Sequence, residues 1–270
     1  KREFIASISH ELRTPLTAIK GYTDVMLNGM MGDVPPVFSQ FLRSIRDNTM
    51  RMITLTNNII SIAEIERGTL GLNYQPVNLE ALLEASVRRH RARCEEQQKT
   101  IVTRIDPPLP EIEADPNRLQ IIIDNLVNNA VKYTHEGGGI TIGAAPIEGA
   151  MQKPAFVTLW VKDDGVGIPV DEQIRIWDRF YRVDQTLSFT AGGLGIGLTI
   201  VKALTEAHGG RVWVDSDLGL GSTFAILLPV QRGREIDDEW LEEVIDPPVQ
   251  DLGIGPGVQN PWTRDDGEAI

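Results

Sequence analysis

The stretch IASISHELRTPLTAIKGYTDVM, residues 5–26, decides the first part of the fold. Its apolar residues recur at the a and d positions of a coiled coil, and Pro15 occupies one of the d positions. The stripe consists of Ile5, Ile8, Leu12, Ile19, Tyr22 and Met26. Residues 1–27 are therefore predicted to form a long helix with a narrow apolar stripe.

Helix-breaking residues at 28–36 separate this helix from a second one, in which the same spacing resumes at Phe38 and ends at Gly68. The second stripe contains Ile45, Met52, Leu55, Ile59 and Ile62, with Asn48 at a d position. Two helices alone cannot enclose a core, so residues 1–67 are predicted to pair with a second copy as a four-helix bundle. Asn48 is either buried, where it would fix the register, or placed at the polar rim.

Strands and helices interleave over residues 76–230, which predicts a two-layer α/β sandwich after a linker at 68–75. Asn78 and Asp115 are placed to begin two helices, and a third is predicted from Gly195 to Ala207. Strands are predicted at 100–105, 139–145, 155–162, 211–215 and 223–229. The second and third of these strands, and likewise the last two, are close enough in sequence to pair antiparallel.

The acidic charge is concentrated at the end of the chain. Residues 231–270 carry 3 basic and 11 acidic residues, so −8 of the net charge of −12 belongs to them. A short helix is compatible with Glu235–Val244, and the remaining prolines and glycines predict disorder, with no function inferred. The acidic balance argues against nucleic acid as a partner, because such binders present a basic face.

Cys94 is the single cysteine of the sequence, which excludes an intrachain disulfide and a cysteine-rich zinc site and favours a reducing, cytoplasmic compartment. No apolar run approaches the ~18–20 residues of a membrane span, and no secretory signal opens the sequence. Because the chain begins with Lys1 inside a helical pattern, we expect a fragment. Contact with a membrane would then need a missing N-terminal part.

His10 and Glu11 form the first candidate site. With Ile5 at position a, His10 falls at position f, the outermost position of the coiled coil. An exposed imidazole is largely neutral at pH 7 and keeps a free nitrogen lone pair. It is a usable nucleophile when a neighbouring carboxylate takes its proton, although a solvated surface histidine is the alternative.

Three segments form the second candidate site. Asn125, Asn128 and Asn129 lie within one predicted helix, where asparagine has poor propensity, so they indicate either a polar face or oxygen ligands for Mg²⁺. Asp163 follows a strand and can accept a hydrogen bond from an exocyclic amine. The glycine-rich residues 192–197 open a helix, where backbone N–H groups attract anions.

Taken in order, these segments resemble the catalytic core of bacterial two-component sensor histidine kinases over residues 1–230. The resemblance is carried by the H box His10–Pro15, the N box Asn125–Tyr133, the first glycine box Asp163–Gly167, the F box Trp177–Arg182, the second glycine box Gly193–Leu198 and the third glycine box Gly219–Ser222. It implies a dimeric helical hairpin and a Bergerat-type ATP-binding sandwich. It also implies ATP and Mg²⁺ as cofactors and a response regulator as partner.

The resemblance implies a role for each matching residue. His10 would be the phosphoacceptor, Glu11 its general base, and Thr14 a residue of phosphatase activity. Asn129 would hold Mg²⁺ together with Asn125, and Asp163 would receive the adenine amino group. The implied ATP-binding residues are Asn125, Asn129, Lys132, Tyr133, Asp163, Gly165, Gly167, Phe180, Arg182, Gly193, Leu194, Gly195, Ile196, Gly197, Leu198 and Thr223. Residues 182–193 would form the lid over ATP, and Leu194 departs from the Ser or Thr that is common at its position.

Two alternatives compete with a histidine kinase. A catalytically inactive dimeric scaffold should have lost His10, Asn129 or Asp163, and all three are present. An ATPase or serine kinase on the same nucleotide-binding fold would lack the helical hairpin with its His-Glu pair. The other histidines, His90, His135 and His208, are expected to be structural or solvated.

Overall fold

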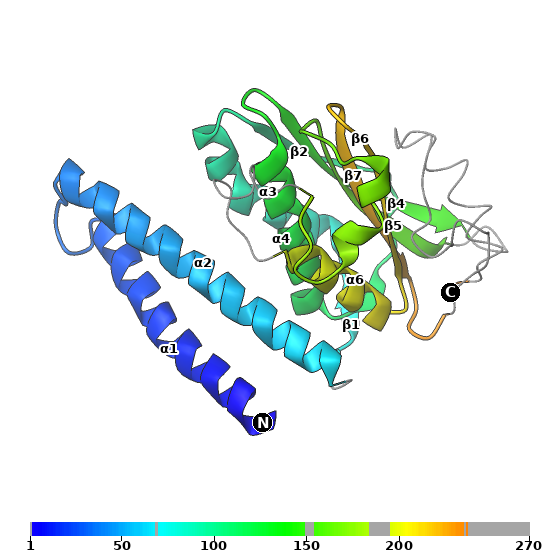
Figure 1. Cartoon of the computed structure of the whole chain (residues 1–270), viewed down its shortest axis with the longest axis horizontal. Coiled ribbons are helices and arrows are strands. Elements are labelled where there is room, and N and C mark those ends of the chain that lie inside the picture. Colours follow the sequence, from blue (N-terminus) through cyan, green and yellow to red (C-terminus); the bar gives the residue numbers. More distant parts are fainter. Residues whose placement is uncertain (1, 68–69, 149–153, 184–194, 235, 237–270) are drawn as a thin grey trace. The chain divides into compact units, whose positions relative to one another are not determined.

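The computed structural model describes residues 2–67, 70–148, 154–183, 195–234 and 236 (Figure 1). The chain divides into two compact units, Lys1–Leu70 and Gly71–Ile270.

The first unit is a helical hairpin, as the sequence predicts. Helix α1 spans Arg2–Leu27 and continues through Pro15, and helix α2 spans Pro36–Glu66 (Figure 1). Gly29 and Gly32 in the connection have positive φ angles, which glycine adopts without steric cost. Pro36 occupies the first turn of α2, where its missing N–H has no helical partner to lose.

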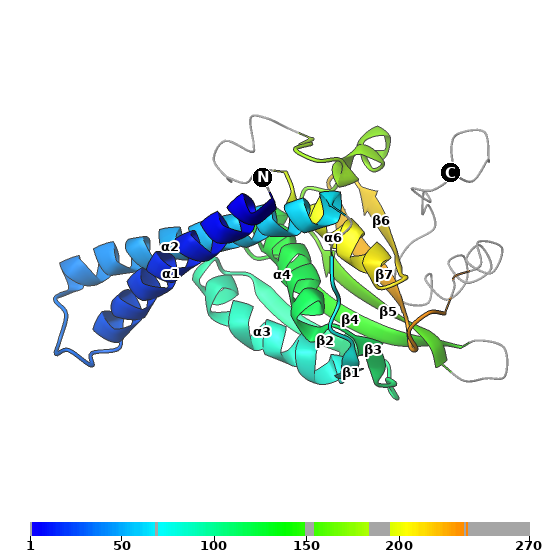
Figure 2. The same cartoon turned by 90° about the horizontal axis from the view of Figure 1, so that it is seen from below.

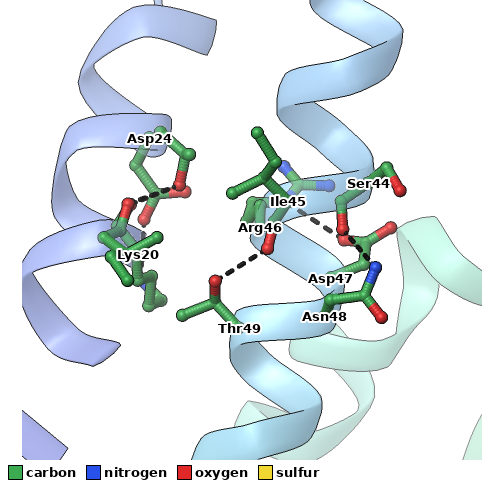
Figure 3. Close-up of polar contacts among 10 residues, drawn as sticks. Lys20, Asp24, Ser44, Ile45, Arg46, Asp47, Asn48 and Thr49 are labelled. Atoms are coloured by element: carbon green, nitrogen blue, oxygen red, sulfur yellow. Dashed lines mark hydrogen bonds and ion pairs between the residues drawn. The ribbon is translucent and has the colours of Figure 1, made fainter. Parts of the chain in front are cut away.

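Small and polar side chains make up much of what is buried in this hairpin. Thr49 lies on the side of α2 that faces α1 in Figure 3, and its hydroxyl donates to the Ile45 carbonyl at 2.7 Å. Thr56 and Ala63 follow at intervals of seven residues, so they share that face of α2. The buried members of the hairpin are Leu16, Thr23, Thr49, Thr56, Asn58, Ser61 and Ala63.

Many large apolar side chains of the hairpin are exposed in the single chain. A heptad series along α2 stays exposed, from 46% at Ile45 to 61% at Phe38, and Met52 and Ile59 lie between these values. On α1 the exposed members are Ile19, Tyr22 and Met26. These members of the predicted stripe are therefore not covered by the other helix of their own hairpin, whereas Leu55 and Ile62 are half-buried.

Asn48 is also exposed, and its amide donates to the Ser44 carbonyl at 2.9 Å on the same helix (Figure 3). Within one chain Asn48 is therefore not buried. One of the two sequence interpretations required a buried Asn48 that fixes the register of the bundle. Lys20 and Asp24 form an ion pair of 2.7 Å along α1 (Figure 3).

The second unit is a two-layer α/β sandwich, as predicted. Its five-stranded sheet has the order β2-β4-β5-β7-β6, in which β2 and β4 are parallel and all other neighbours antiparallel. The strands are β2 (Thr100–Ile105), β4 (Gly139–Glu148), β5 (Pro154–Asp163), β6 (Arg211–Asp217) and β7 (Gly221–Pro229). Helices α3 (Leu79–Glu96), α4 (Pro116–Tyr133) and α6 (Gly197–Ala207) cover one face of the sheet (Figures 1 and 2).

The predicted helix caps are present. The Asn78 side chain accepts a hydrogen bond from the Ala81 N–H at 2.9 Å, and the Asp115 carboxylate accepts two at the start of α4. The third helix begins at Gly197 and not at Gly195. Gly195 has a φ of +70°, which is incompatible with the first turn of a right-handed helix.

Sequence analysis missed a small second sheet, in which β1 (Gln75–Val77) pairs antiparallel with β3 (Ile112–Ala114). Strand β1 begins inside the predicted linker. Each of these strands has three residues, which is too short to display an alternating pattern. Two short 3-10 helices, η1 (Val170–Glu172) and η2 (Arg175–Trp177), were not predicted either.

The other histidines are structural or solvated, as expected. His90 is buried, with Nδ1 at 3.0 Å from the Ser86 carbonyl, and His135 is exposed. His208 is buried between the Leu204 carbonyl and the Asp115 N–H, and this burial lowers its pKa. None of the helices within the described ranges is both long and apolar enough to cross a membrane.

Candidate functional site

A buried carboxylate lies at the centre of the candidate site. Asp163 ends β5 with 4% of its surface exposed, and its Oδ1 accepts the Gly165 N–H at 2.9 Å. Burial raises the pKa of Asp163 to about 6, although the N–H groups of Gly165 and Ser222 favour the ionised form. Near neutral pH Asp163 is thus an acceptor-only group in an apolar setting. Such a group suits an exocyclic amine.

The first and third glycine boxes are packed against each other. Gly165 has no room for a side chain, because a Cβ there would lie 2.3 Å from the Tyr133 carbonyl oxygen. Gly167 has a φ of +68°, and a Cβ would lie 1.9 Å from the Asp217 carbonyl oxygen. Gly221 has a φ of +102°, and its Cβ would lie 2.0 Å from the Asp163 carbonyl oxygen. The backbone can therefore close around Asp163 only with glycine at these positions.

Ser216 holds these two segments together. Its hydroxyl accepts the Ile168 N–H at 2.8 Å and donates to the Gly221 carbonyl at 2.8 Å. The Ser216 carbonyl accepts the Gln173 side-chain amide at 2.6 Å. Sequence analysis missed Ser216 and Gln173, and neither belongs to a motif that could have marked them.

Asn125 lies against the beginning of α6. Its Nδ2 donates to the Ile121 carbonyl of its own helix at 2.8 Å, which leaves Oδ1 as an acceptor without a donor among the residues that the structure describes. A Cβ at Gly197 would lie 2.9 Å from that Oδ1. The structure thus brings together the N box and the second glycine box, which are far apart in the sequence.

The three asparagines of α4 separate into two groups. Asn129 is four residues after Asn125, so the two share one face of the helix, and it is half-buried. The Asn128 Oδ1 instead accepts a hydrogen bond from Arg93 on α3 at 2.9 Å. Beside it, Arg89 on α3 binds both oxygens of Asp124 at 2.8 Å. Asn128 therefore serves helix packing.

Lys132 and Tyr133 end α4 as a pair. The Lys132 Nζ donates to the Tyr133 hydroxyl at 2.8 Å and lies 4.5 Å from the centre of its ring. The Tyr133 carbonyl accepts the Val166 N–H at 3.3 Å, which ties this helix end to the first glycine box.

The F box is bonded to the segment that opens α6. Phe180, with a φ of +63° and 68% of its surface exposed, donates its N–H to the Gly195 carbonyl at 3.0 Å. The Trp177 carbonyl accepts the Thr199 hydroxyl at 3.0 Å. Arg182, Ile196 and Leu198 belong to the residues that the structure describes. Gly193, Leu194 and most of the predicted lid lie outside them.

Thr223 is not brought to Asp163. In the register of β5 and β7, Asp163 is opposite Ser222 and Lys162 is opposite Thr223. Because side chains alternate along a strand, the Thr223 side chain lies on the other face of the sheet. Ser222 occupies the place expected for Thr223, and its hydroxyl lies 2.8 Å from that of Ser216. The sequence could not mark it, because the face of a β7 residue relative to Asp163 depends on the register between β5 and β7.

The residues of the H box lie on helix α1. The side chains of His10 and Glu11 lie outside the described residues, while Thr14, one turn after His10, is exposed. The sequence-predicted site is therefore divided between the two units, with the candidate nucleophile in one and the glycine cradle in the other.

The residues of the second unit fit ATP and Mg²⁺ in chemical terms. Asp163 supplies a buried acceptor, and the glycine segments leave space that side chains would fill. Among the described residues no cluster of three or more His, Cys, Asp or Glu could hold a metal. Amide oxygens such as Asn125 Oδ1 remain, and they suit an ion that keeps several waters and binds phosphates, as Mg²⁺ does.

Two families match the chain. Residues 1–68 match the His Kinase A (phospho-acceptor) domain, and residues 114–232 match the histidine kinase-, DNA gyrase B- and HSP90-like ATPase family. The sensor histidine kinase WalK of Bacillus subtilis (strain 168) is 33% identical over 244 residues, which are 90% of this chain and 38% of WalK. WalK of Staphylococcus haemolyticus (strain JCSC1435) is 34% identical over 247 residues. The chain thus spans well under half the length of these relatives.

Solved structures of two histidine kinases are also similar to this chain. Full-length ShkA in complex with AMPPNP aligns with a TM-score of 0.66 and 31% identity over 86% of this chain and 47% of ShkA. ThkA in complex with the response regulator TrrA aligns with a TM-score of 0.52 over 84% of this chain and 61% of that chain. At 23% identity this second likeness supports the fold alone.

Proposed function

Because the chain belongs to the two-component sensor histidine kinases and contains their catalytic core, we propose that it phosphorylates itself on His10 with ATP and passes the phosphoryl group to an aspartate of a response regulator. As an ATP-consuming activity, this would take place in the cytoplasm.

The observation that carries this proposal is the cradle around Asp163. A buried carboxylate is enclosed by glycines of two segments that admit no Cβ, and in the same unit an amide oxygen of α4 lies beside Gly197. A dead scaffold has no need for these constraints. A nucleotide-binding ATPase without phosphotransfer has no need for the H-box helix.

In this proposal each residue has a defined part. Ionised Asp163 accepts a hydrogen bond from the adenine amino group. Asn129 and Asn125 offer amide oxygens to Mg²⁺, which would neutralise phosphate charge when bound. Backbone N–H groups at the start of α6 bind phosphate oxygens.

His10 attacks the γ-phosphorus in line, a nitrogen–phosphorus bond forms, and the bond to the β–γ bridging oxygen breaks as ADP leaves. Glu11 takes the imidazole proton. We further propose that Thr14 orients water for removal of phosphate from the response regulator. Its exposed position one turn from His10 supports this role.

We also propose that residues 1–67 form a homodimer. The exposed heptad series along α2 and the exposed apolar residues of α1 support it, because an uncovered apolar stripe on a hairpin requires a partner. The second partner in this proposal is a response regulator, the class of protein with which ThkA forms its complex.

Labelling with γ-³²P-ATP tests the function. The chain should acquire protein-bound phosphate that is lost in acid and survives base, as a phosphoramidate does. His10→Gln should lose all of this label, while the control His135→Gln, at an exposed histidine, should keep it. Glu11→Gln should label roughly 10²–10⁴-fold more slowly. Acid-labile label in His10→Gln would contradict the proposal.

A further inference from the structure

The face of the five-stranded sheet opposite the helices carries large apolar side chains. The Asp163 side of β5 faces the helices, so alternation places Phe156, Thr158 and Trp160 on the opposite, outer face. Register then adds residues from the neighbouring strands, with Trp160 opposite Gly143 and Ala225, and Trp213 opposite Ala225. The outer-face cluster consists of Ala145, Ile147, Phe156, Trp160, Trp213, Ala225 and Leu227, and Ala155 packs with it.

This outer-face cluster is buried. Trp160 has 1% of its surface exposed and Trp213 has 2%, and β7 is buried along its whole length. An antiparallel sheet with helices on one face commonly leaves the other face wet, with polar side chains on it. Side chains of neighbouring strands shield an indole from solvent within the plane of the sheet, but they do not cover the side of the indole that points away from the sheet. The outer face therefore needs a cover of its own.

The polypeptide after β7 begins that cover. Ile236 packs against the outer-face cluster, and the Arg234 guanidinium lies 5.3 Å from the centre of the Phe156 ring. The chain continues from Ile236 for 34 residues, 237–270. It thus reaches the outer face and has ample length to cross it.

Trp213 offers a second, independent observation. Its indole Nε1–H is buried and has no acceptor among the residues that the structure describes. A buried donor without an acceptor is costly, so an oxygen from a further segment is expected against it. The chain after Ile236 is rich in such oxygens.

The sequence of this continuation fits an apolar surface. At 100° per residue, Trp240, Leu241, Val244 and Ile245 fall within one arc of a helix, which also contains Asp237 at the very start of the segment. The acidic residues Asp238, Glu239, Glu242, Glu243 and Asp246 fall on the opposite arc. Pro247 and Pro248 then end the helix. The outer face also bears three cations, Arg104, Lys162 and Arg211, and one carboxylate, Asp215, so its net positive charge is complementary to this acidic segment.

We propose that residues 237–249 dock in cis on the outer face of the sheet, with the part before Pro247 as an amphipathic helix whose Trp240, Leu241, Val244 and Ile245 cover Trp160 and Trp213. Ile236 is the first contact of this interface. The segment is then part of the ATPase domain, in place of the disordered tail predicted from composition.

Two truncated chains test the docking, one ending at Ile236 and the other at Gln250. The longer chain carries Trp240→Phe, so that both contain only Trp160, Trp177 and Trp213. Acrylamide should quench tryptophan fluorescence severalfold more strongly in the shorter chain. Adding a synthetic peptide of residues 236–250 that also carries Trp240→Phe to the shorter chain should restore the protection. Equal quenching in the two truncated chains would overturn the proposal.

A point variant tests it in the complete chain, should the shorter chain fail to fold. Leu241→Asp places a charge on the apolar arc and should increase hydrogen exchange of the β5, β6 and β7 amides. Its matched control Glu242→Gln, on the acidic arc, should leave that exchange unchanged. If protection of these amides from exchange fell on dilution, the outer face would be covered by a second copy of the chain. If Leu241→Asp and Glu242→Gln exchanged equally, residues 237–249 would not cover it. Either result contradicts the proposal.

Discussion

At the scale of single residues, the ionised form of Asp163 that we propose for adenine binding lowers the stability of the folded state. Its pKa is raised from 3.8 to about 6, so the unfolded chain ionises first as the pH rises. Between pH 4 and pH 6 the folded state holds more protons, and stability therefore falls with rising pH over this window. A shift of about two pKa units corresponds to about 3 kcal/mol.

Asp163→Asn should therefore raise the free energy of unfolding above pH 6 and flatten its decline between pH 4 and pH 6, as measured by urea unfolding across pH. The same variant should bind ATP much more weakly, since its amide can present a donor to the adenine amine. The exposed Asp171→Asn serves as the control and should change neither property. A parental pH profile in Asp163→Asn would exclude this carboxyl as the cause.

The parent chain should show the complementary effect in binding. As the pH falls below about 6, protonation of Asp163 removes the acceptor, and ATP affinity should fall with it. Calorimetric titration of ATP between pH 5 and pH 8 measures this. Affinity that stays constant over the range would separate adenine binding from the Asp163 carboxylate.

Asn128 and Asn129 are neighbours in sequence with different contacts. Asn129→Ala should abolish Mg²⁺-dependent labelling with little change in stability. Asn128→Ala should keep the labelling and destabilise the fold by about 1 kcal/mol, because it removes the acceptor of Arg93. Labelling assays and thermal unfolding of both variants distinguish the two roles, and equal loss of labelling would refute the division.

Single residues also mark the limit of prediction from sequence. The type and spacing of Asp163, Asn125 and the glycines indicated a nucleotide site. The structure encloses Asp163 with Gly165 and Gly221 and sets Asn125 against Gly197, and the roles of these residues stay predictions. Thr223, predicted to bind ATP, lies on the face of the sheet opposite to Asp163, because one position along a strand changes the face. Helical spacing alone could not show that Asn128 has a partner on another helix.

At the scale of elements, the beginning of α6 is fitted to α4. Gly197→Ala adds a methyl group 2.9 Å from Asn125 Oδ1, so one of the two elements must shift. We expect weaker ATP binding by at least about tenfold, the equivalent of ~1.4 kcal/mol, measured by calorimetric titration.

The matched control is Gly21→Ala, because Gly21 lies within α1 and a Cβ there would meet nothing within 4 Å. This change should stabilise the helix by up to about 1 kcal/mol and leave ATP affinity unchanged. Unaltered affinity in Gly197→Ala would mean that Asn125 and α6 are not coupled in this way.

Elements with a long periodic pattern were predictable, and short ones were not. Helices α3 and α4 begin at the caps read from the sequence, and β4 and β5 pair antiparallel as expected. The three-residue strands β1 and β3 are held by pairing with each other across the chain, which no local pattern reports.

At the scale of the whole molecule, the exposed stripe of the hairpin should determine assembly. Met52→Asp places a charge within the heptad series of α2 and should shift the chain from dimer to monomer in sedimentation at micromolar concentration. Gln40→Asp adds the same charge to an exposed position of the same helix, 200° around the helix from Phe38, and should remain dimeric. If the Met52→Asp and Gln40→Asp variants formed dimers of equal stability, the dimer contact would not include the heptad series of α2.

The threonine-lined interior of the hairpin has a consequence for how copies are exchanged. Because Thr49, Thr56 and Ala63 bury little apolar surface within one chain, most of the hydrophobic gain in folding the hairpin should come from the partner. Separation of two copies would then be an unfolding event. Two differently tagged populations, once mixed, should form hybrids only at the rate of hairpin unfolding, independent of their concentrations. Pairs formed at synthesis would then persist, so each copy would keep the partner with which it first folded.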